Sequence, residues 1–135
     1  MAEIKGGCLC GAVRYTAETE QTSAVICHCT DCQKFTGAAF AALVPVQKAA
    51  MTLTGPVKTH TALGGSGKLV LRNFCAECGS SLFEEPTVRP GLAILFAGTL
   101  DDPKAVSPAR EIFRDDAFPW VAVHGDIPRF PKAAG

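Results

Sequence analysis

Two short stretches, CLCG at residues 8–11 and CAECG at residues 75–79, constrain this chain more strongly than any other part of its sequence. Each stretch carries two cysteines and ends in Cys-Gly. A metal-binding turn needs backbone amides directed at the thiolates, and glycine tolerates the positive φ that often follows the second cysteine. Two such turns facing each other would give the closed, tetrahedral Cys₄ site that structural zinc prefers. The expected ligands of this structural zinc are Cys8, Cys10, Cys75 and Cys78.

A third stretch, CHCTDC at residues 27–32, holds the remaining cysteines. Cys27, Cys29 and Cys32 lie within this one stretch, and Gln33 rather than glycine follows them. Once the first four cysteines are assigned, no cysteine is left to act as a fourth ligand here. Three protein ligands and one open position are typical of a catalytic zinc.

Other interpretations of the same cysteines stay open on spacing alone. The third stretch fits a second structural zinc equally well if His28, Asp31 or a distant histidine supplies the fourth ligand. An iron–sulfur cluster is disfavoured because the spacings match no standard pattern. A thioredoxin-like redox role for residues 75–78 is disfavoured because no βαβ context surrounds them.

Length, charge and hydropathy limit the classes of protein to consider. The chain has 135 residues, which suits one domain spanning residues 1–135. Its 13 basic and 13 acidic side chains balance, which leaves no electrostatic footprint for nucleic acid. The longest apolar run, residues 38–46, is far shorter than the roughly 18 residues of a membrane span, and no apolar targeting segment begins the sequence. We therefore expect a cytoplasmic protein that binds neither nucleic acid nor membrane. In that reducing setting seven cysteines, an odd number, favour metal over disulfides.

Many short β-prone runs, separated by Gly and Pro turns, predict a mostly β fold with little helix. The expected strands are 12–16, 24–26, 51–54, 57–62, 69–74, 81–84, 92–96 and 120–123. The alanine-rich run 38–44 fits either a helix or a buried strand. Residues 33–37 are expected to form a short polar turn. A short helix or turn is expected after Asp101, because Pro108 interrupts anything longer.

The cysteine stretches and their flanks resemble a known family. Residues 6–15, 27–34 and 74–80 are closely similar to the motifs of the glutathione-dependent formaldehyde-activating enzyme family, also called the centromere protein V family, in the same order and spacing. The resemblance covers nearly the whole chain. It implies a small, single-domain, tent-like fold of short antiparallel strands. It also implies two zinc ions per chain, a structural one at the first four cysteines and a catalytic one at the other three.

Three residues next to the third group of cysteines are candidates for a role in its chemistry. Lys34 can steer an anionic, peptide-like ligand, or be an ordinary exposed lysine. Asp31 can accept a hydrogen bond behind the ligands or hold water, or simply be a turn residue. His28 is expected to face away from the zinc, because neighbouring residues of an extended segment point in opposite directions.

A few isolated residues receive simpler interpretations. Arg72 is expected to be solvated, although its charge could hold an anionic substrate. Glu84 and Glu85 are interpreted as a strand end rather than an acid–base pair. Trp120 is expected in the core or at the rim of the site, and Phe35 in the core.

The resemblance implies a carbon–sulfur lyase acting on S-(hydroxymethyl)glutathione, the adduct of glutathione and formaldehyde. The predicted substrate class is a small thiol or thiol adduct, with glutathione as the candidate thiol. Zinc would act as a Lewis acid while the C–S bond forms or breaks. Two alternatives remain: a non-catalytic zinc-binding interaction module, and a thiol-based metal or redox sensor that uses the Cys27 group. The sequence leaves a homodimer open.

Overall fold

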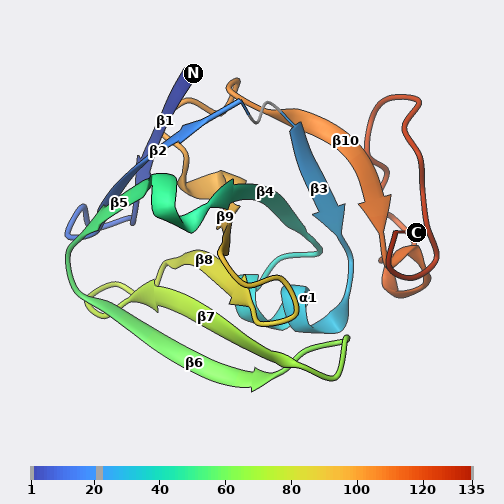
Figure 1. Ribbon diagram of the computed structural model, residues 1–135. Helices are drawn as coiled ribbons and strands as arrows, with labels where there is room; N and C mark the ends of the chain where they lie inside the picture. The colour runs from blue at the N-terminus through green and yellow to red at the C-terminus, as the bar shows by residue number, and fades with distance from the viewer. Residues whose placement is uncertain (1, 21–22, 135) are drawn as a thin grey trace.

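The chain forms two β-sheets (Figure 1) in the part that the computed structural model describes, residues 2–20 and 23–134. The small sheet has three strands, β1 (Ala2–Gly7), β2 (Arg14–Thr19) and β5 (Met51–Thr54), in the order β1-β2-β5. The large sheet has seven strands, in the order β10-β3-β4-β9-β8-β7-β6. Its strands are β3 (Ser23–Cys27), β4 (Ala41–Gln47), β6 (Val57–Leu63), β7 (Leu69–Cys75), β8 (Ser81–Pro86), β9 (Leu92–Phe96) and β10 (Ser107–Ile112). The mostly β prediction is confirmed.

Helix is a minor component. One α-helix, α1 (Thr30–Thr36), follows β3 directly. The short 3₁₀ helices are η1 (Lys48–Ala50), η2 (Ala97–Thr99) and η3 (Arg114–Asp116). None of these described helices has the length and apolar character that crossing a membrane requires.

The main core lies between the two sheets. Val44, Ala93 and Leu95 of the large sheet are fully buried, and they belong to the same apolar cluster as Tyr15 and Ala17 of the small sheet. Successive side chains of a strand point to opposite faces, so alternate residues of β4 and β9 reach this core. Full burial of a Val or Leu side chain stabilises the fold by about 1.5–3 kcal/mol.

A second, smaller core lies on the opposite face of the large sheet. Leu43 and Phe96, the neighbours of core residues in β4 and β9, cluster there with Cys27. Phe35 of α1 packs on them, with its ring centroid 5.5 Å from that of Phe96, which agrees with the core role expected for it. Figure 1 shows α1 next to the large sheet, at the end of β3. The third group of cysteines therefore lies at the start of α1, on the face of the large sheet opposite the main core.

Most of the expected strands are present. All of them except 120–123 coincide with strands of the structure, and the ambiguous run 38–44 proves to be mainly strand, as part of β4. The turn expected beyond Asp101 is present. Two strands, β1 and β10, were not predicted. β10 runs parallel to β3, which departs from the otherwise antiparallel pairing expected.

The prediction of a polar turn at residues 33–37 is wrong, because these residues belong largely to α1. Cys29 is the N-cap of this helix, and its Sγ accepts a hydrogen bond from the backbone N–H of Cys32 at 3.3 Å. Gly37 ends the helix in a left-handed conformation with φ 69°. The helix is thus specified by its caps rather than by a long apolar period.

The prediction of a strand at residues 120–123 is also wrong. The backbone that pairs with β10 comes from further along the chain: Glu111 N–H donates to Pro128 O at 3.0 Å, and Phe130 N–H donates to Glu111 O at 2.9 Å. Trp120 is therefore free of the sheet. It is 76% exposed rather than in the core, and its ring contacts that of Phe118.

Candidate metal centres

The first four cysteines come together, as their spacing predicts. The Sγ atoms of all four lie within 4.8 Å of one another. Cys8 and Cys10 Sγ are 3.6 Å apart, and Cys10 and Cys75 Sγ are 3.9 Å apart. Four sulfurs at 2.3 Å from a tetrahedral zinc would be about 3.8 Å apart. The donor set and its dimensions therefore fit a Cys₄ metal site.

Backbone amides surround these sulfurs, as expected of a metal-binding turn. Val13 N–H donates to Cys8 Sγ at 3.2 Å, and Glu77 N–H donates to Cys75 Sγ at 3.3 Å. The glycine after each second cysteine has positive φ, 83° at Gly11 and 77° at Gly79. These donors offset thiolate charge.

The Cys₄ group joins the two sheets. Cys8 and Cys10 follow β1 of the small sheet, whereas Cys75 ends β7 of the large sheet and Cys78 lies in the turn before β8. Hydrogen bonds from Ser80 lower the pKa of Cys78 to about 5, so this thiol gives up its proton readily. A metal ion here would hold the sheets together at one end.

The other three cysteines form a separate group. Cys27 ends β3, Cys29 caps α1, and Cys32 lies one turn into the helix, so that their Sγ atoms lie within 4.8 Å of one another. Cys27 and Cys32 are buried, and Cys29 is half-buried. In the described part of the chain no other histidine, cysteine or carboxylate joins this group. The arrangement thus fits a metal with three protein ligands, of which Cys29 is the one partly exposed to solvent.

The three thiols differ in pKa, because each thiol affects the ionisation of its neighbours. Hydrogen bonds from Cys27 and then Cys32 lower the pKa of Cys29 to about 2. The same close packing raises the pKa of Cys27 to about 12, chiefly through its hydrogen bond with Cys29. The pKa of Cys32 is raised as well, chiefly through its hydrogen bond with Cys27. A metal ion binding all three sulfurs displaces the remaining protons.

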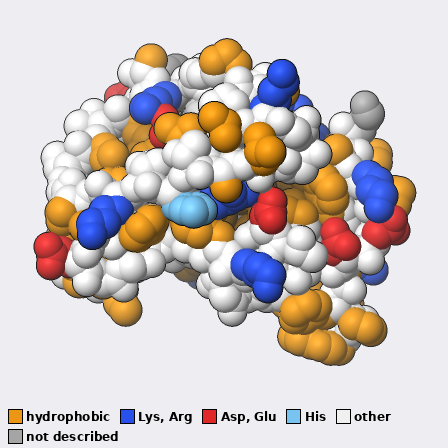
Figure 2. Space-filling model, turned by 90° about the horizontal axis from the view of Figure 1, so that it is seen from below, with side chains coloured by type: hydrophobic (Ala, Val, Ile, Leu, Met, Phe, Trp, Pro, Cys, Tyr) orange, Lys and Arg blue, Asp and Glu red, His pale blue; other side chains and the backbone are white. Residues whose placement is uncertain are grey.

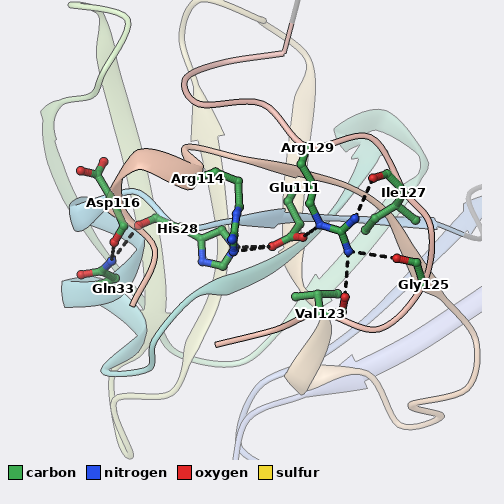
Figure 3. A network of polar contacts seen from close by, with 9 residues as sticks. All are labelled: His28, Gln33, Glu111, Arg114, Asp116, Val123, Gly125, Ile127 and Arg129. Carbon is green, nitrogen blue, oxygen red and sulfur yellow. Dashed lines mark hydrogen bonds and ion pairs between the residues drawn. The ribbon is translucent and has the colours of Figure 1, made fainter. Parts of the chain in front are cut away.

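His28 points away from this group. Its ring is fully buried, and Nε2 lies 2.7 Å from Glu111 Oε1 of β10 (Figure 3). A carboxylate only accepts, so Nε2 donates the hydrogen bond. Nδ1 has no hydrogen-bond partner among the described residues, and the ring packs against Phe40. His28 is therefore not brought to the sulfurs as a fourth ligand.

Glu111 is the centre of the network drawn in Figure 3. It accepts hydrogen bonds from His28, from Arg114 at 3.4 Å and from Arg129 Nε. Burial raises the pKa of this carboxyl, but the hydrogen bonds from His28 and Arg129 and the charge of Arg114 outweigh it and lower the pKa below its ordinary value. The guanidinium of Arg129 also donates to three backbone carbonyls of the C-terminal loop, those of Val123, Gly125 and Ile127. Arg129 thereby links the C-terminal loop to β10, whose last residue pairs with Cys27.

Asp31 and Lys34 occupy opposite ends of α1. Asp31 is exposed in the first turn, with Oδ2 3.6 Å from Nη2 of Arg72. Lys34 is exposed in the last turn and makes no ion pair within the described residues. Both side chains are thus exposed, and Asp31 also contacts Arg72 of the large sheet.

Two charged residues near this site have a different environment from the one expected. Arg72 of β7 is buried, not solvated, and its Nε lies 3.7 Å from Oε2 of Glu84 on β8. Burial raises the pKa of Glu84 to about 6; the charges of Cys29 and Asp31 add to this effect, and that of Arg72 opposes it. Alternation along β7 and β8 could have indicated that both residues share a face, but not that α1 covers it.

Comparison with known proteins agrees with this geometry. The family model of the glutathione-dependent formaldehyde-activating enzyme matches residues 3–116. A crystal structure of a Rhodobacter sphaeroides protein, a structural-genomics target, has a similar fold, with a TM-score of 0.60. That protein is 20% identical to this chain, and the match covers 93% of this chain and 98% of the other. At this identity the likeness concerns the fold alone. No curated protein matches the sequence.

The matched residues include both groups of cysteines that could hold metal ions. The family match and the independently observed geometry lead to the same conclusion. The chain belongs to the glutathione-dependent formaldehyde-activating enzyme family.

Proposed function

We propose that the protein is a zinc-dependent carbon–sulfur lyase acting on a small thiol adduct such as S-(hydroxymethyl)glutathione in the cytoplasm. One observation carries the proposal: three cysteine sulfurs lie close enough to share a metal, and no fourth ligand joins them among the described residues. A three-ligand site with an open position is the arrangement used by catalytic zinc. The family to which the chain belongs supports the substrate class.

The two sites have different roles in this proposal. The ligands of the structural zinc are Cys8, Cys10, Cys75 and Cys78. Those of the catalytic zinc are Cys27, Cys29 and Cys32. When bound at the second site, zinc supplies a Lewis acid that polarises the oxygen or sulfur of the adduct.

The residues of the chain bind and orient the adduct. The amide of Cys32 donates to Cys29 Sγ, which offsets part of the negative charge that three thiolates collect. The apolar side chains of Phe35 and Phe96 exclude water behind the sulfurs. Lys34, exposed at the end of α1, attracts an anionic peptide such as glutathione toward this face. Asp31 orients Arg72 at the edge of the site.

A second candidate function is a thiol-based metal or redox sensor. The low pKa of Cys29 and its partial exposure favour it, because a thiolate that oxidants can reach is the reactive form of cysteine. In that case mild oxidation would release the second metal while the Cys₄ site stays filled.

Metal content and turnover test the proposal together. Native mass spectrometry is expected to find two zinc ions per chain in the wild type and one in Cys29→Ser, with the fold retained. NMR of S-(hydroxymethyl)glutathione breakdown should show catalysis by the wild type only. One zinc in both proteins would exclude the catalytic site. Loss of both ions and of the fold in Cys29→Ser would make the site structural and favour an interaction module.

A further inference from the structure

We propose that Glu84 carries the proton that passes between the sulfur and the oxygen of the adduct at the three-cysteine site. The proposal rests on the proposed function, since it assigns a role in that reaction. It gives the buried carboxyl of β8 a task that neither the family match nor the cysteine geometry assigns.

The strand register places Glu84 on the same face as the cysteines. Directly opposite residues of neighbouring strands point to the same side. Cys27 lies opposite Ala41 of β4, two residues before Leu43, and Leu43 lies opposite Phe96 of β9. Ile94, two residues before Phe96, lies opposite Glu84 and packs against the cysteine cluster. The carboxyl is thus one strand away from a residue that packs against the apolar cluster containing Cys27 and Cys32.

The same row continues beyond Glu84. Arg72 lies opposite it on β7, and His60 lies opposite Arg72 on β6. Asp31 reaches the row from α1. Figure 2, which shows the molecule from the side of β6, shows a histidine, basic and acidic side chains close together among apolar ones. A row of polar side chains, His60, Arg72 and Glu84, therefore extends from the exposed strand β6 toward the three-cysteine site.

Glu84 is the least satisfied of the buried or nearly buried carboxylates. Glu111 accepts three hydrogen bonds, and Glu85 pairs with Lys48 and accepts one from Asn73 at 3.0 Å. Glu84 has only Arg72 as a partner within the described residues, and at 3.7 Å that contact is too long for a hydrogen bond. Its side chain is 11% exposed. Its oxygens are thus free to accept and release a proton.

The charges around Glu84 suit proton transfer near neutral pH. Arg72 faces it from β7, Asp31 and Cys29 face it from α1, and His60 lies one strand beyond Arg72. Burial raises the pKa of Glu84 to about 6, with Cys29 and Asp31 adding to the effect and Arg72 opposing it. A general acid–base group works best when its pKa lies near the operating pH, because both forms are then populated.

The step balances without any further reactant. In the direction of adduct formation, the thiol gives its proton to the Glu84 carboxylate. Its sulfur electron pair then forms the C–S bond to the aldehyde carbon, and the C=O π pair moves onto oxygen. Glu84 returns the proton to that oxygen and gives the hydroxyl group. Breakdown of the adduct follows the same path in reverse, as microscopic reversibility requires.

Counting protons on ligand binding tests this role without relying on turnover. Glutathione is titrated calorimetrically into zinc-loaded protein at pH 7.5, in buffers of different ionisation enthalpy. The free thiol is mainly protonated at this pH. A glutathione thiolate bound at the three-cysteine site adds negative charge near Glu84 and raises the pKa of this carboxyl above the pH of the titration. The wild type then keeps the thiol proton on Glu84, so we expect Glu84→Gln to release about one more proton per chain into the buffer.

Glu85→Gln is the matched control, because Glu85 is the next residue of β8 and points to the opposite face. It should release the same number of protons as the wild type. In the adduct assay, Glu84→Gln is expected to lower kcat about 10²–10⁴-fold with little change in KM, and to remove the acid limb of the pH profile.

The two proposals fail in different ways. Equal proton release by wild type and Glu84→Gln, with glutathione bound to both, overturns the role of Glu84 and leaves the lyase proposal standing. Absence of glutathione binding to any variant, with two zinc ions present, overturns both. Circular dichroism and zinc content of Glu84→Gln establish that the variant is folded and loaded, and Glu84→Asp provides the conservative variant that should regain part of kcat.

Discussion

The His28 ring and the Glu111 carboxylate form a fully buried hydrogen bond of 2.7 Å across 83 residues of sequence. It joins the turn that carries the three-cysteine site to β10. Through Arg129 it also reaches the C-terminal loop. The segment that carries the three-cysteine group is therefore linked to a part of the chain that contains none of its cysteines.

Removing the carboxylate at the centre of this network should destabilise the whole protein. Glu111→Ala leaves His28 and Arg129 without their buried partner, which typically costs about 3–5 kcal/mol. Urea unfolding measures the change, with Glu3→Ala, an exposed residue, as the control. We also expect the variant to lose its second zinc before its first on titration with a chelator. An unchanged free energy of unfolding would mean that the network contributes nothing net.

The two metal sites should differ in what their removal does to the fold. Cys10→Ser opens the Cys₄ site, which joins the sheets, so we expect the variant to be largely unfolded or to melt at a much lower Tm. Cys29→Ser should keep a native circular dichroism spectrum and lose one zinc. Thermal unfolding with metal analysis of both proteins checks this order. The reverse order would assign the structural role to the three-cysteine site.

Glu84 should make stability depend on pH. Its pKa is about 6 in the fold and 4.5 ordinarily, so the folded state binds the extra proton between these values. The stabilising contribution is complete below pH 4.5 and is lost as the pH rises through 6, a change of about 2 kcal/mol.

Glu84→Gln lacks this titration. The difference in unfolding free energy between wild type and variant, measured in urea from pH 5 to 7, should therefore fall as the pH rises. Comparing the two proteins at each pH cancels the weakening of metal binding in acid. A constant difference would place the pKa of Glu84 at its ordinary value.

The glycine of the second Cys₄ turn should tolerate a side chain poorly. Gly79 has φ 77°, and a β-carbon there would meet no atom within 4 Å, so the cost of Gly79→Ala is backbone strain alone. We expect about 1–2 kcal/mol of destabilisation. Gly98→Ala, which has equal space and no positive φ, is the control and should change the unfolding free energy little. A larger loss in Gly98→Ala than in Gly79→Ala would contradict the strain argument.

The sequence indicated both groups of cysteines, because ligand spacing and the following glycine are local features. It indicated most strands for the same reason, because the β-prone residue pattern of a strand such as β7 or β9 can be recognised within that strand's own residues. The helix α1 escaped prediction because it has seven residues and begins at a cysteine rather than at a usual N-cap. Trp120 was expected in the core or at the rim of the site, but the backbone pairing of Phe130 with β10 leaves it exposed and outside the core.

The surroundings of the second site could not be derived from local patterns. Arg72 and Glu84 are ordinary charged residues in two strands, and only the register of five neighbouring strands, β3, β4, β9, β8 and β7, brings them to the face of Cys27. His28 could be predicted to face away from the metal, but its partner Glu111 lies in β10, a strand that was not predicted. Long-range pairing decides which charged groups are buried, and a single sequence carries little information about it.

The two metal sites also differ in when a growing chain can complete them. Cys27, Cys29 and Cys32 are local, so a metal ion can be captured by this segment before any sheet exists. The Cys₄ site needs Cys8 to meet Cys78 and therefore waits for most of the molecule, at the higher entropic cost of closing a long loop. During synthesis a metal ion can thus bind the three-cysteine group first, and a metal ion at the Cys₄ group would then join the sheets of a chain that already carries one.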